Sequence, residues 1–505
     1  MPNNQHRPRD LLVLNRLLNN SINPRQRTCR NSSPGTCGDS RPRLSVRAQP
    51  GLLCSGSPRA KNAAQQPDPK YRLCLRRKDA LTLHNPHRMT QETQVRGCHL
   101  CHIMNSSMTA PHPPSTPPAK FDDQDRVFAQ AFTILQQAID QAFPGASLSV
   151  THQGTLVALK AVGSFTYDKN PGGDFDLKST TPKPGAPFLA SFARSGDFDS
   201  EVTPTTLFDL ASLTKVVATT TMAMLLYARG LLDLEAPAAA IVPEFTTDNK
   251  RDPRRREATL RMLLAHSSGL PAHEKFFLKA HTRDELLQAA ITTPLAADPA
   301  TRAQYSDIGF IILGVALERL ADESLDRFCQ REIFSPLAMT NTTFNPPPDV
   351  RGKIPPTQDD QTFRKRIIQG EVQDENASVL GGVAPQAGLF STAADLAKFA
   401  QAMLSPRNPI LRPETITLFT RREPTPPGTT RALGWDTPSN PSQSGKYFSP
   451  HSYGHFGYTG TSLWIDPTRQ LSITLLTNRT WPDCSNEAIK QLRPKFHNAI
   501  IEALK

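Results

Sequence analysis

One stretch constrains the fold more than any other, the apolar run Val216-Val-Ala-Thr-Thr-Thr-Met-Ala-Met-Leu-Leu226. A helix that is apolar on nearly every side lies inside a sizeable core rather than on a surface. Arg229-Gly230 follows as a C-terminal stop. Directly before the run, Ser212-Leu-Thr-Lys215 places a hydroxyl and an amine three residues apart, so on a helix they share one face. A hydroxyl held against an amine on a buried platform is the arrangement of an activated serine nucleophile.

Charge and composition divide the chain near residue 110. Residues 1–110 hold 18 of the 58 Lys and Arg residues and 5 of the 46 acidic residues, which leaves 40 basic and 41 acidic residues for a nearly neutral remainder. The first segment is rich in Arg, Pro, Ser, Asn and Gln, and such a composition buries too little apolar surface to offset the entropy of ordering. We therefore predict a disordered basic tail and Pro-rich linker over 1–118, and a folded domain over 119–505.

Three hypotheses account for residues 1–107. They are a basic arm for nucleic acid or an anionic membrane surface, a targeting extension, or a non-functional segment read in frame upstream of a start at Met104 or Met108. Cys98-His-Leu-Cys-His102 matches the c-type haem attachment pattern, but attachment needs export and a packed domain with a second axial ligand, and the sequence shows neither. For the folded domain we expect no nucleic-acid partner.

The sequence indicates neither a membrane span nor a signal peptide. No apolar run approaches the ~20 residues needed to cross a bilayer, and Leu11-Leu-Val-Leu14 is too short for the core of a signal peptide. The body contains only Cys329 and Cys484, which does not suggest a disulfide framework. We expect a cytoplasmic protein by default, or a periplasmic one if the true start or export route differs, and we leave the oligomeric state open.

Hydrophobic periodicity predicts an α+β fold. Residues 127–143 carry apolar side chains at helical spacing, and alternating segments at 146–150 and 156–159 read as a β-hairpin. The last strands and the last helix bring the C-terminus to the same antiparallel sheet, which helices flank, and the middle of the chain forms a mostly helical subdomain. The predicted strands are 463–466 and 471–476, and the predicted helices are 259–265, 283–293, 307–321, 324–334, 392–404, 412–420 and 488–504.

Two further motifs supply what a serine nucleophile needs: a base, oxyanion donors and a group that returns the proton. Lys215 acts as a base only if its pKa falls well below ~10.4, which burial favours. Tyr305-Ser-Asp307 precedes a predicted helix and offers a phenol, although Ser306 or Asp307 also suits an ordinary helix cap. Gly454-His-Phe-Gly-Tyr-Thr-Gly-Thr-Ser462 lets a strand edge pass close to a substrate carbonyl, or forms a simple glycine-rich turn.

The order of these three motifs resembles that of the serine β-lactamase and penicillin-binding-protein superfamily. Within it, the chain is similar to class C β-lactamase-like serine hydrolases, a group of esterases and D-Ala-D-Ala carboxypeptidases. The resemblance covers roughly 120–505 and includes Thr259-Leu-Arg-Met-Leu-Leu-Ala-His-Ser-Ser-Gly-Leu-Pro271. It implies a β-lactamase/transpeptidase-like fold. It also implies a serine hydrolase that acts through an acyl-enzyme on an ester, amide or D-alanyl peptide bond, without a cofactor or metal.

The same resemblance assigns roles to single residues. Ser212 is the acylated nucleophile, Lys215 its basic partner, and Tyr305 the general base or the acid to the leaving group. The remaining roles are an oxyanion hole made by the backbone N–H groups of Ser212 and Tyr458, and substrate binding by Asp307, His455 and Gly457.

Departures from the family pattern change what we expect of the site. His455 replaces a lysine, and because histidine is only partly charged near neutrality, an ester or amide is favoured over strong β-lactamase activity. Asp307 replaces the common asparagine. If Asp307 touches Lys215, it keeps the lysine cationic, and Tyr305 becomes the better base with its pKa lowered by Lys215. If Asp307 points away, Lys215 itself takes the proton.

Three other positions leave alternatives open. Gln373 and Pro385-Gln386 stand where relatives often carry His and Gly-His, which suggests that the two imidazoles pair or share a ligand there, and we expect no metal dependence here. His266 invites a Ser-His-Asp hypothesis, but we favour the simpler prediction of a helix-end histidine that ties down a loop. A catalytically idle module that captures penicillins or peptidoglycan fragments is the alternative function. Pocket shape decides among the substrates.

Overall fold

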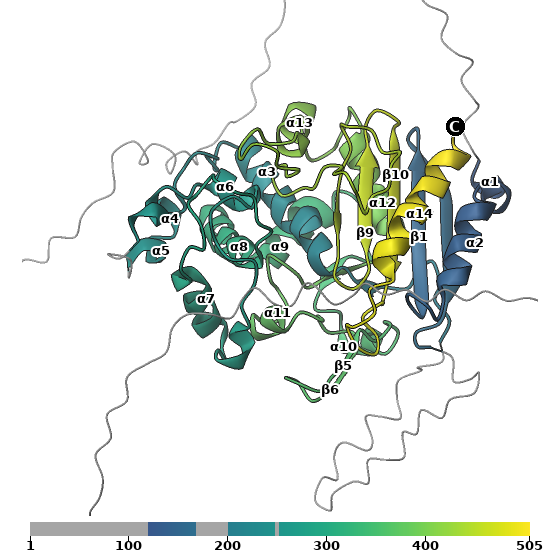
Figure 1. Ribbon diagram of the computed structural model, residues 1–505, viewed down its shortest axis with the longest axis horizontal. Helices are drawn as coiled ribbons and strands as arrows, with labels where there is room; N and C mark the ends of the chain where they lie inside the picture. Colours follow the sequence, from purple (N-terminus) through teal and green to yellow (C-terminus); the bar gives the residue numbers. More distant parts are fainter. Residues whose placement is uncertain (1–119, 168–199, 248–251) are drawn as a thin grey trace, which may run out of the picture. The chain divides into compact units, whose positions relative to one another are not determined.

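The N-terminal hairpin and the last three strands form one antiparallel sheet in the computed structural model (Figure 1). The structure describes residues 120–167, 200–247 and 252–505. The strand order is β2-β1-β10-β9-β8, so β1 pairs with β10 although more than three hundred residues separate them along the chain. This arrangement confirms the predicted α+β fold and its sheet built from both chain ends. The haem-type motif and the predicted tail lie outside the described residues, and the boundary at 118 stays a prediction.

The elements have the following bounds. The five-stranded sheet consists of β1 Gly145–His152, β2 Thr155–Gly163, β8 Tyr453–Phe456, β9 Ser462–Asp466 and β10 Leu471–Thr477. Two small sheets contain β3 Phe208–Asp209, β7 Leu389–Ser391 and β4 Thr343–Phe344, and β5 Gln358–Asp360 and β6 Arg366–Ile368. The helices are α1 Gln124–Val127, α2 Ala129–Ala138, α3 Thr221–Ala228, α4 Ala238–Ile241, α5 Glu244–Thr247, α6 Leu260–Leu264, α7 Arg283–Thr292, α8 Asp307–Ala321, α9 Leu325–Cys329, α10 Pro348–Arg351, α11 Glu375–Val379, α12 Ala393–Leu404, α13 Pro413–Thr420 and α14 Ile489–Ala503.

Strand β1 shows how the sheet is covered on both faces. Leu148 and Val150 belong to the apolar cluster that also contains residues of α2 and α14, and these two helices pack against each other on one face (Figure 1). Ser149 points the other way and donates a hydrogen bond to the carbonyl of Ala393, the first residue of α12, at 2.8 Å. Because side chains alternate along a strand, a half-polar, half-apolar strand fits between a helix pair and a single helix.

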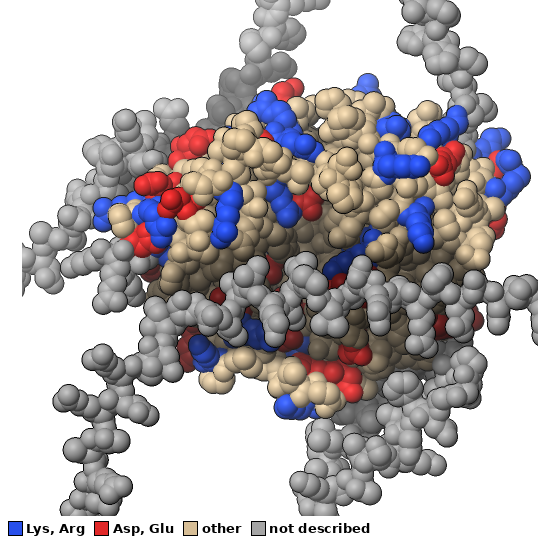
Figure 2. Space-filling view, viewed as in Figure 1, with Lys and Arg blue, Asp and Glu red and all other residues tan. Residues whose placement is uncertain are grey.

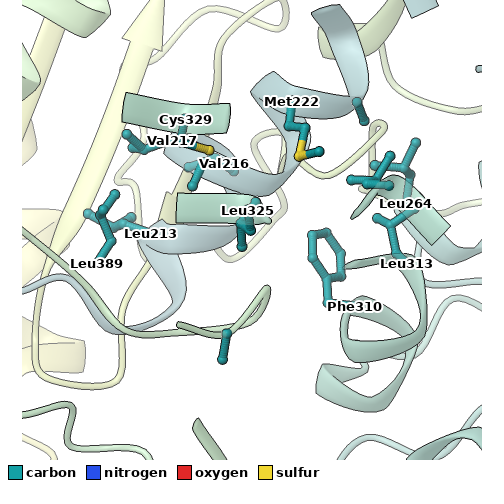
Figure 3. Close-up of a cluster of buried hydrophobic side chains, with 14 of the residues drawn as sticks. Leu213, Val216, Val217, Met222, Leu264, Phe310, Leu313, Leu325, Cys329 and Leu389 are labelled. Carbon is teal, nitrogen blue, oxygen red and sulfur yellow. The ribbon is translucent and has the colours of Figure 1, made fainter. Parts of the chain in front are cut away.

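The apolar run identified in the sequence lies in the core of the helical subdomain, as predicted. Every residue from Val216 to Leu226 is buried. Figure 3 shows Val217 and Met222 within a cluster that includes Cys329 of α9 and Phe310 of α8. By length and composition, 211–228 would also suffice to cross a bilayer, but most of this segment is buried inside the protein. The run is therefore the central core helix of the subdomain.

The backbone of this run is less regular than the sequence predicts. A 3-10 turn at Ala211–Leu213 leads into a π-helical segment at Lys215–Thr220, and only then does α3 begin. Thr221 donates its hydroxyl to the carbonyl of Val216, five residues earlier, at 2.9 Å, which suits the wider π turn. The helix ends at the predicted stop, because Gly230 has a φ of 70° and the N–H of Leu231 bonds the carbonyl of Leu226 at 2.9 Å.

Other predicted elements agree closely with the structure, and a few do not. The N-terminal helix was predicted to reach Phe143 but ends at Ala138, because Ile139 leaves the helical conformation and Asp140 has a φ of 65°. The hairpin turn is confirmed at Gln153-Gly154, with φ values of 52° and 76°. Strands of two to four residues, such as β3, β7 and β8, were missed because they are too short to show a period of two.

The surface agrees with the nearly neutral balance of the body. On the face seen in Figure 2, Lys and Arg side chains lie among Asp and Glu side chains. Ion pairs of this kind include Arg319 with Glu244, at 2.8 Å, and Arg254 with Asp298, at 2.7 Å. Exposed pairs contribute little to stability, so the fold depends on its two apolar cores rather than on these charges.

Two glycines on α8 provide a matched test of packing. A Cβ at Gly314 would lie 1.9 Å from Cγ of Pro385, whereas a Cβ at Gly309 meets nothing nearer than 3.5 Å. We predict that Gly314→Ala destabilises the protein by about 1–3 kcal/mol through overpacking. Gly309→Ala is expected to be neutral or to stabilise by up to about 1 kcal/mol through helix propensity. Urea denaturation curves of the two variants measure the difference, and equal midpoints would contradict the close approach of α8 to Pro385.

Candidate active site

The backbone before Ser212 is held in an unusual conformation. Ala211 has a φ of 47°, a left-handed value that strains a residue with a side chain. The carboxylate of Asp209 accepts the N–H of Ala211 at 2.8 Å and the N–H of Gln373 at 2.7 Å. Burial raises the pKa of Asp209 to about 6, against the effect of these two N–H groups. Asp209 therefore ties the turn that carries Ser212 to the segment around Gln373.

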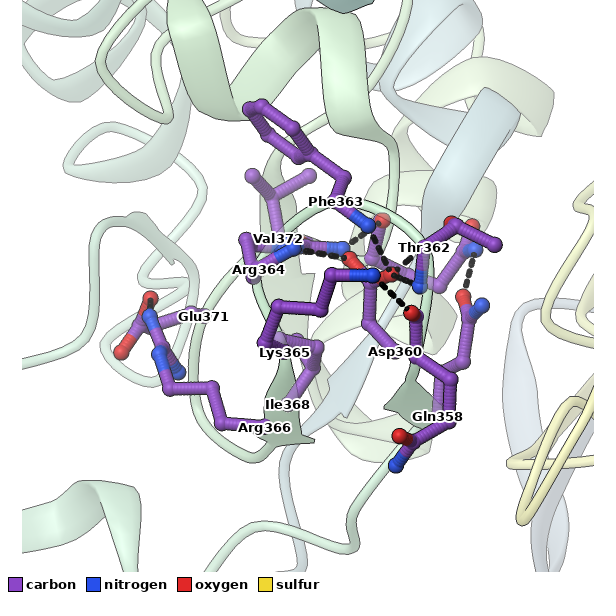
Figure 4. A network of polar contacts seen from close by, with 12 residues as sticks. Gln358, Asp360, Thr362, Phe363, Arg364, Lys365, Arg366, Ile368, Glu371 and Val372 are labelled. Carbon is purple, nitrogen blue, oxygen red and sulfur yellow. Dashed lines mark hydrogen bonds and ion pairs between the residues drawn. The ribbon is translucent and has the colours of Figure 1, made fainter. Parts of the chain in front are cut away.

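That segment is anchored in turn by the hairpin β5–β6. Figure 4 shows the carboxylate of Asp360 gathering the N–H groups of Thr362, Phe363 and Arg364, at 2.9–3.0 Å. The guanidinium of Arg364 binds Asp360 at 3.0 Å and donates to the carbonyls of Val372 and Gln373, both at 2.6 Å. The hairpin thus fixes the chain that holds Asp209, and through it the serine turn.

The structure brings together the three residues for which the sequence predicts catalytic roles. The hydroxyl oxygen of Ser212 lies 3.1 Å from Nζ of Lys215 and 2.7 Å from Oη of Tyr305. Lys215 is completely buried, and its Nζ also donates to Oδ1 of Asp307 at 2.6 Å and to the carbonyl of Gln386 at 2.9 Å. The hydroxyl is therefore held between an amine and a phenol that arrive from different elements.

Asp307 touches Lys215, which is the contact that the first of the two cases considered for this residue requires. Burial by itself would raise the pKa of Asp307, but the Lys215 ammonium and His273 lower it to about 2. Burial lowers the pKa of Lys215, and the Asp307 carboxylate opposes that change. Ser306 caps α8 through the N–H of Gly309 at 3.0 Å. This leaves Asp307 free to face the lysine.

The pKa of Tyr305 differs from what we expected if Asp307 touched Lys215. Burial, and then the Asp307 carboxylate, raise its pKa well above the usual 10.0, so the phenol is protonated near neutral pH. The Nζ of Lys215 faces the ring of Tyr305, 4.8 Å from the centroid. The prediction of a lowered pKa for Tyr305 is therefore wrong, because desolvation and Asp307 outweigh the hydrogen bond to Ser212 and the charge of Arg431.

His455 lies on β8 and is also different from expectation. Its side chain is buried, and burial together with Lys215 and Arg431 lowers its pKa to about 3. Its Nδ1 lies 2.8 Å from the carbonyl oxygen of Phe456, and its ring lies 5.8 Å from that of Tyr305. The predicted partial charge is therefore wrong: His455 is a neutral wall of the site and does not act as a cation.

Gly457 is needed for a close approach. A Cβ there would lie 1.9 Å from Oγ1 of Thr461 and 2.6 Å from the carbonyl oxygen of Leu210. The end of β8 is thus pressed against the backbone that precedes Ser212. Among the hydrogen bonds of the described residues, neither the N–H of Ser212 nor that of Tyr458 has a protein acceptor. Both predicted oxyanion donors therefore remain available.

Two residues of the site carried no signal in the sequence. The guanidinium of Arg431 lies 5.4 Å from the centre of the Tyr305 ring and pairs with Asp436. His273 lies with Nδ1 3.6 Å from Oδ2 of Asp307, and this contact is the main reason that its pKa is raised. Neither position belongs to a motif, and only tertiary contacts bring them here.

His266 has the simpler of its two predicted roles. His266 lies just after α6, and its Nδ1 accepts the N–H of Ser306 at 3.0 Å. The centre of its ring lies 4.8 Å from that of the Tyr305 ring. The helix-end histidine that ties down a loop is therefore confirmed. Gln373 and Gln386 each bond a neighbouring side chain. The side-chain amide of Gln373 donates to Gln358 at 2.7 Å, and that of Gln386 donates to Asp374 at 3.4 Å. Within the described ranges, no three His, Cys, Asp or Glu side chains cluster as a metal site.

A cleft of about 530 Å³ opens beside the serine. Volumes of this order suit small molecules and short peptides. Its walls come from the serine turn, β8, the turn after it and the beginning of α14. The lining includes Ser212, Tyr305, Arg431, His455, Tyr458 and Arg493.

Comparison with known proteins agrees with this geometry. The sequence model of the family described as Beta-lactamase matches residues 125–493, which is most of the chain. The chain belongs to the β-lactamase family. It is 32% identical over 378 residues to the N-acetylmuramyl-L-alanine amidase of Bacillus subtilis (strain 168), covering 68% of this chain and 79% of that protein. It is 30% identical over 377 residues to a putative D-alanyl-D-alanine carboxypeptidase of Escherichia coli (strain K12), covering 68% and 80%.

The solved structures support the fold. A class C β-lactamase from Rhodobacter sphaeroides aligns with a TM-score of 0.53 and 22% identity, over 75% of this chain and 99% of that chain. The β-lactamase/transpeptidase-like fold predicted from the sequence is therefore confirmed. Family membership makes this protein a β-lactamase-related hydrolase, and the family fits small-molecule or peptide substrates.

The buried pair of Lys215 and Asp307 predicts a pH-dependent contribution to stability. We expect Asp307→Asn to lower the free energy of unfolding at pH 7 by ~3 kcal/mol, because it leaves a buried ammonium unpaired. The folded-state pKa of Asp307, about 2, lies below its usual 3.8. The contribution is therefore complete above the unfolded value and disappears as the pH falls through about 2.

Urea denaturation at several pH values measures this contribution. Asp298→Asn is the control, because Asp298 forms an exposed ion pair with Arg254 and should contribute less than ~1 kcal/mol. Equal losses in the two variants at pH 7 would contradict the importance of the buried pair.

Proposed function

We propose that this protein is a serine hydrolase that opens an amide or ester bond through an acyl-enzyme on Ser212. One observation carries the proposal: the Ser212 hydroxyl lies on the wall of the cleft, 3.1 Å from the Lys215 amine and 2.7 Å from the Tyr305 phenol. A serine flanked in this way has one neighbour that can take its proton and another that can pass a proton to the leaving group.

Burial indicates how the protons are distributed before attack. Burial disfavours the ammonium of Lys215 and the phenolate of Tyr305 alike, and the pKa shifts of both residues follow that rule. In the proposed reaction the Lys215 ammonium, which is paired with Asp307 at rest, first loses its proton to solvent, so that a neutral amine lies beside a neutral phenol. Lys215 accepts the Ser212 proton, and Tyr305 donates its proton to the leaving nitrogen or oxygen.

Asp307 acts in the same step by stabilising the ammonium that forms on Lys215. Its carboxylate lies 2.6 Å from Nζ and is ionised across the neutral range. An interaction that strengthens as charge develops lowers the barrier rather than merely binding the ground state. The negative charge that develops on the substrate oxygen is received by the N–H groups of Ser212 and Tyr458.

The cleft favours a peptide-like amide over a β-lactam. Neutral His455 supplies no cation where the β-lactamases resembled by this chain carry a lysine, and the guanidinium of Arg431 is shared with Asp436. The names of the two bacterial relatives refer to amide bonds of cell-wall material, an N-acetylmuramyl-L-alanine link and a D-alanyl-D-alanine link. We infer that the physiological substrate is an amide bond of such a peptide without a free carboxylate beside the scissile bond, and that activated esters are cleaved as well.

Replacement of the nucleophile tests the mechanism. We expect Ser212→Ala to reduce hydrolysis of a p-nitrophenyl ester, a D-Ala-D-Ala peptide and a muramyl peptide by at least ~10³-fold, because the covalent step is lost. Ser462→Ala, which removes another hydroxyl 3.3 Å from His497, is the control and should keep most of the activity. Hydrolysis at the wild-type rate by Ser212→Ala would refute the proposal.

A penicillin label distinguishes an enzyme from the idle binding module. If the protein is an enzyme, it should hydrolyse at least one of the three substrates, whether or not the penicillin label on Ser212 is released. If the label persists for hours while none of the three substrates is hydrolysed, the binding module is the correct function.

The pH profile tests the role of Asp307. Removing its charge lowers the pKa of Lys215, since the carboxylate is what favours the ammonium. We predict that Asp307→Asn shifts the acidic limb of kcat/KM toward lower pH and lowers the maximal rate by ~10²-fold. An unshifted limb would show that Lys215 is not the group whose deprotonation limits the reaction.

A further inference from the structure

Arg493 is a buried cation without a carboxylate partner. It lies on α14 with 4% of its surface exposed, and none of the ion pairs among the described residues includes it. Burial, and then the nearby Arg479, lower its pKa to about 9. A charge in this position costs stability unless hydrogen bonds compensate for its desolvation.

The guanidinium of Arg493 binds the turn that follows β8. One terminal nitrogen donates to the carbonyl of Gly457 at 2.9 Å and to the carbonyl of Thr461 at 2.8 Å. The other donates to the side chain of Gln443 at 3.2 Å. The N–H of Gly457 also bonds the carbonyl of Thr461 at 2.7 Å, so the cation and the backbone close the same turn.

The carbonyl of Gly457 belongs to the same peptide unit as the N–H of Tyr458. The two ends of a peptide are coupled by resonance, so a cation bound to the oxygen withdraws electron density from the nitrogen. Hydrogen bonds in a chain strengthen one another through such polarisation, especially where water is excluded. The N–H of Tyr458 is thereby made a stronger donor and is held in one orientation.

We propose that Arg493 is a positioning residue that polarises and orients the Gly457–Tyr458 peptide as an oxyanion donor. This inference rests on the proposed function, because it assigns Tyr458 N–H to the oxyanion hole. Arg493 acts through that peptide and does not contact the reacting atoms. The C-terminal helix thus contributes to the chemistry although its own side chains do not attack, protonate or accept charge.

Arg479 offers a control within the same turn. It is 6% exposed, and its Nε donates to the carbonyl of Tyr458 at 2.7 Å. That carbonyl belongs to the following peptide unit, whose N–H is that of Thr459. Arg479 also holds the carbonyls of Cys484 at 3.1 Å and Asn486 at 2.9 Å. It therefore supports the turn as Arg493 does, but without polarising the donor peptide.

The experiment compares Arg493→Gln, Arg493→Lys and Arg479→Gln in the full-length protein. The probe is a penicillin labelled with ¹³C at the reactive carbonyl, and infrared spectroscopy measures the carbonyl stretch of the acyl-enzyme on Ser212. Steady-state kinetics on a p-nitrophenyl ester supplies kcat and KM, and urea midpoints report the stability of each variant.

We expect Arg493→Gln to raise the carbonyl frequency and to lower kcat by about 10- to 100-fold with little change in KM, a smaller effect than removal of a whole oxyanion donor. Arg493→Lys retains the cation, so its carbonyl frequency and its kcat should lie between those of Arg493→Gln and of the wild-type protein. Arg479→Gln should leave the carbonyl frequency of the acyl-enzyme unchanged, even if it lowers the urea midpoint as much as Arg493→Gln does.

Two results would overturn the inference. An acylated Arg493→Gln with the wild-type frequency would refute it, as would an equal shift in Arg479→Gln. If the wild-type protein forms no acyl-enzyme on Ser212 with either the penicillin or the p-nitrophenyl ester, the proposed function fails together with the inference about Arg493. The behaviour of the wild-type protein thus separates the two failures.

Discussion

The active-site geometry depends on one buried ammonium. Lys215 has no exposed surface, and its three hydrogen bonds reach Ser212, the carboxylate of Asp307 and the carbonyl of Gln386. These groups come from the serine turn, from the start of α8 and from the segment before β7, which are far apart in the sequence. Because a buried amine must satisfy its donors or lose its charge, the fold has to bring those segments to one point.

The segments around Lys215 are held in place by hydrogen bonds and by one close backbone contact. Asp209 holds the left-handed backbone of Ala211 and the N–H of Gln373, and Arg364 holds the carbonyl of Gln373 from the other side. On the opposite wall, Gly457 allows β8 to press against the carbonyl of Leu210. The serine is thus positioned by a carboxylate, a guanidinium and a close backbone contact, none of which reacts.

The charges around the cleft are used mostly for positioning. His455 is neutral, and the guanidinium groups of Arg479 and Arg493 are directed to backbone carbonyls of the turn between β8 and β9. A site built this way can support charge that develops during the reaction while offering few free cations to a charged ground state. That balance suits an amide or ester substrate better than one that relies on a strong carboxylate anchor.

The sequence by itself determined the elements and the family. Local properties depend on residues that are close together in the sequence. They include the periodicity of the long helices, the hairpin at Gly154 and the spacing from Ser212 to Lys215. Short strands such as β3 and β8 escaped prediction because two to four residues carry no period. Only the tertiary structure decided that Asp307 touches Lys215 and that burial leaves Tyr305 protonated and His455 neutral. It alone also placed three further residues at the site, Arg431, His273 and Arg493. Those outcomes depend on desolvation and on contacts between distant segments, and a sequence shows neither.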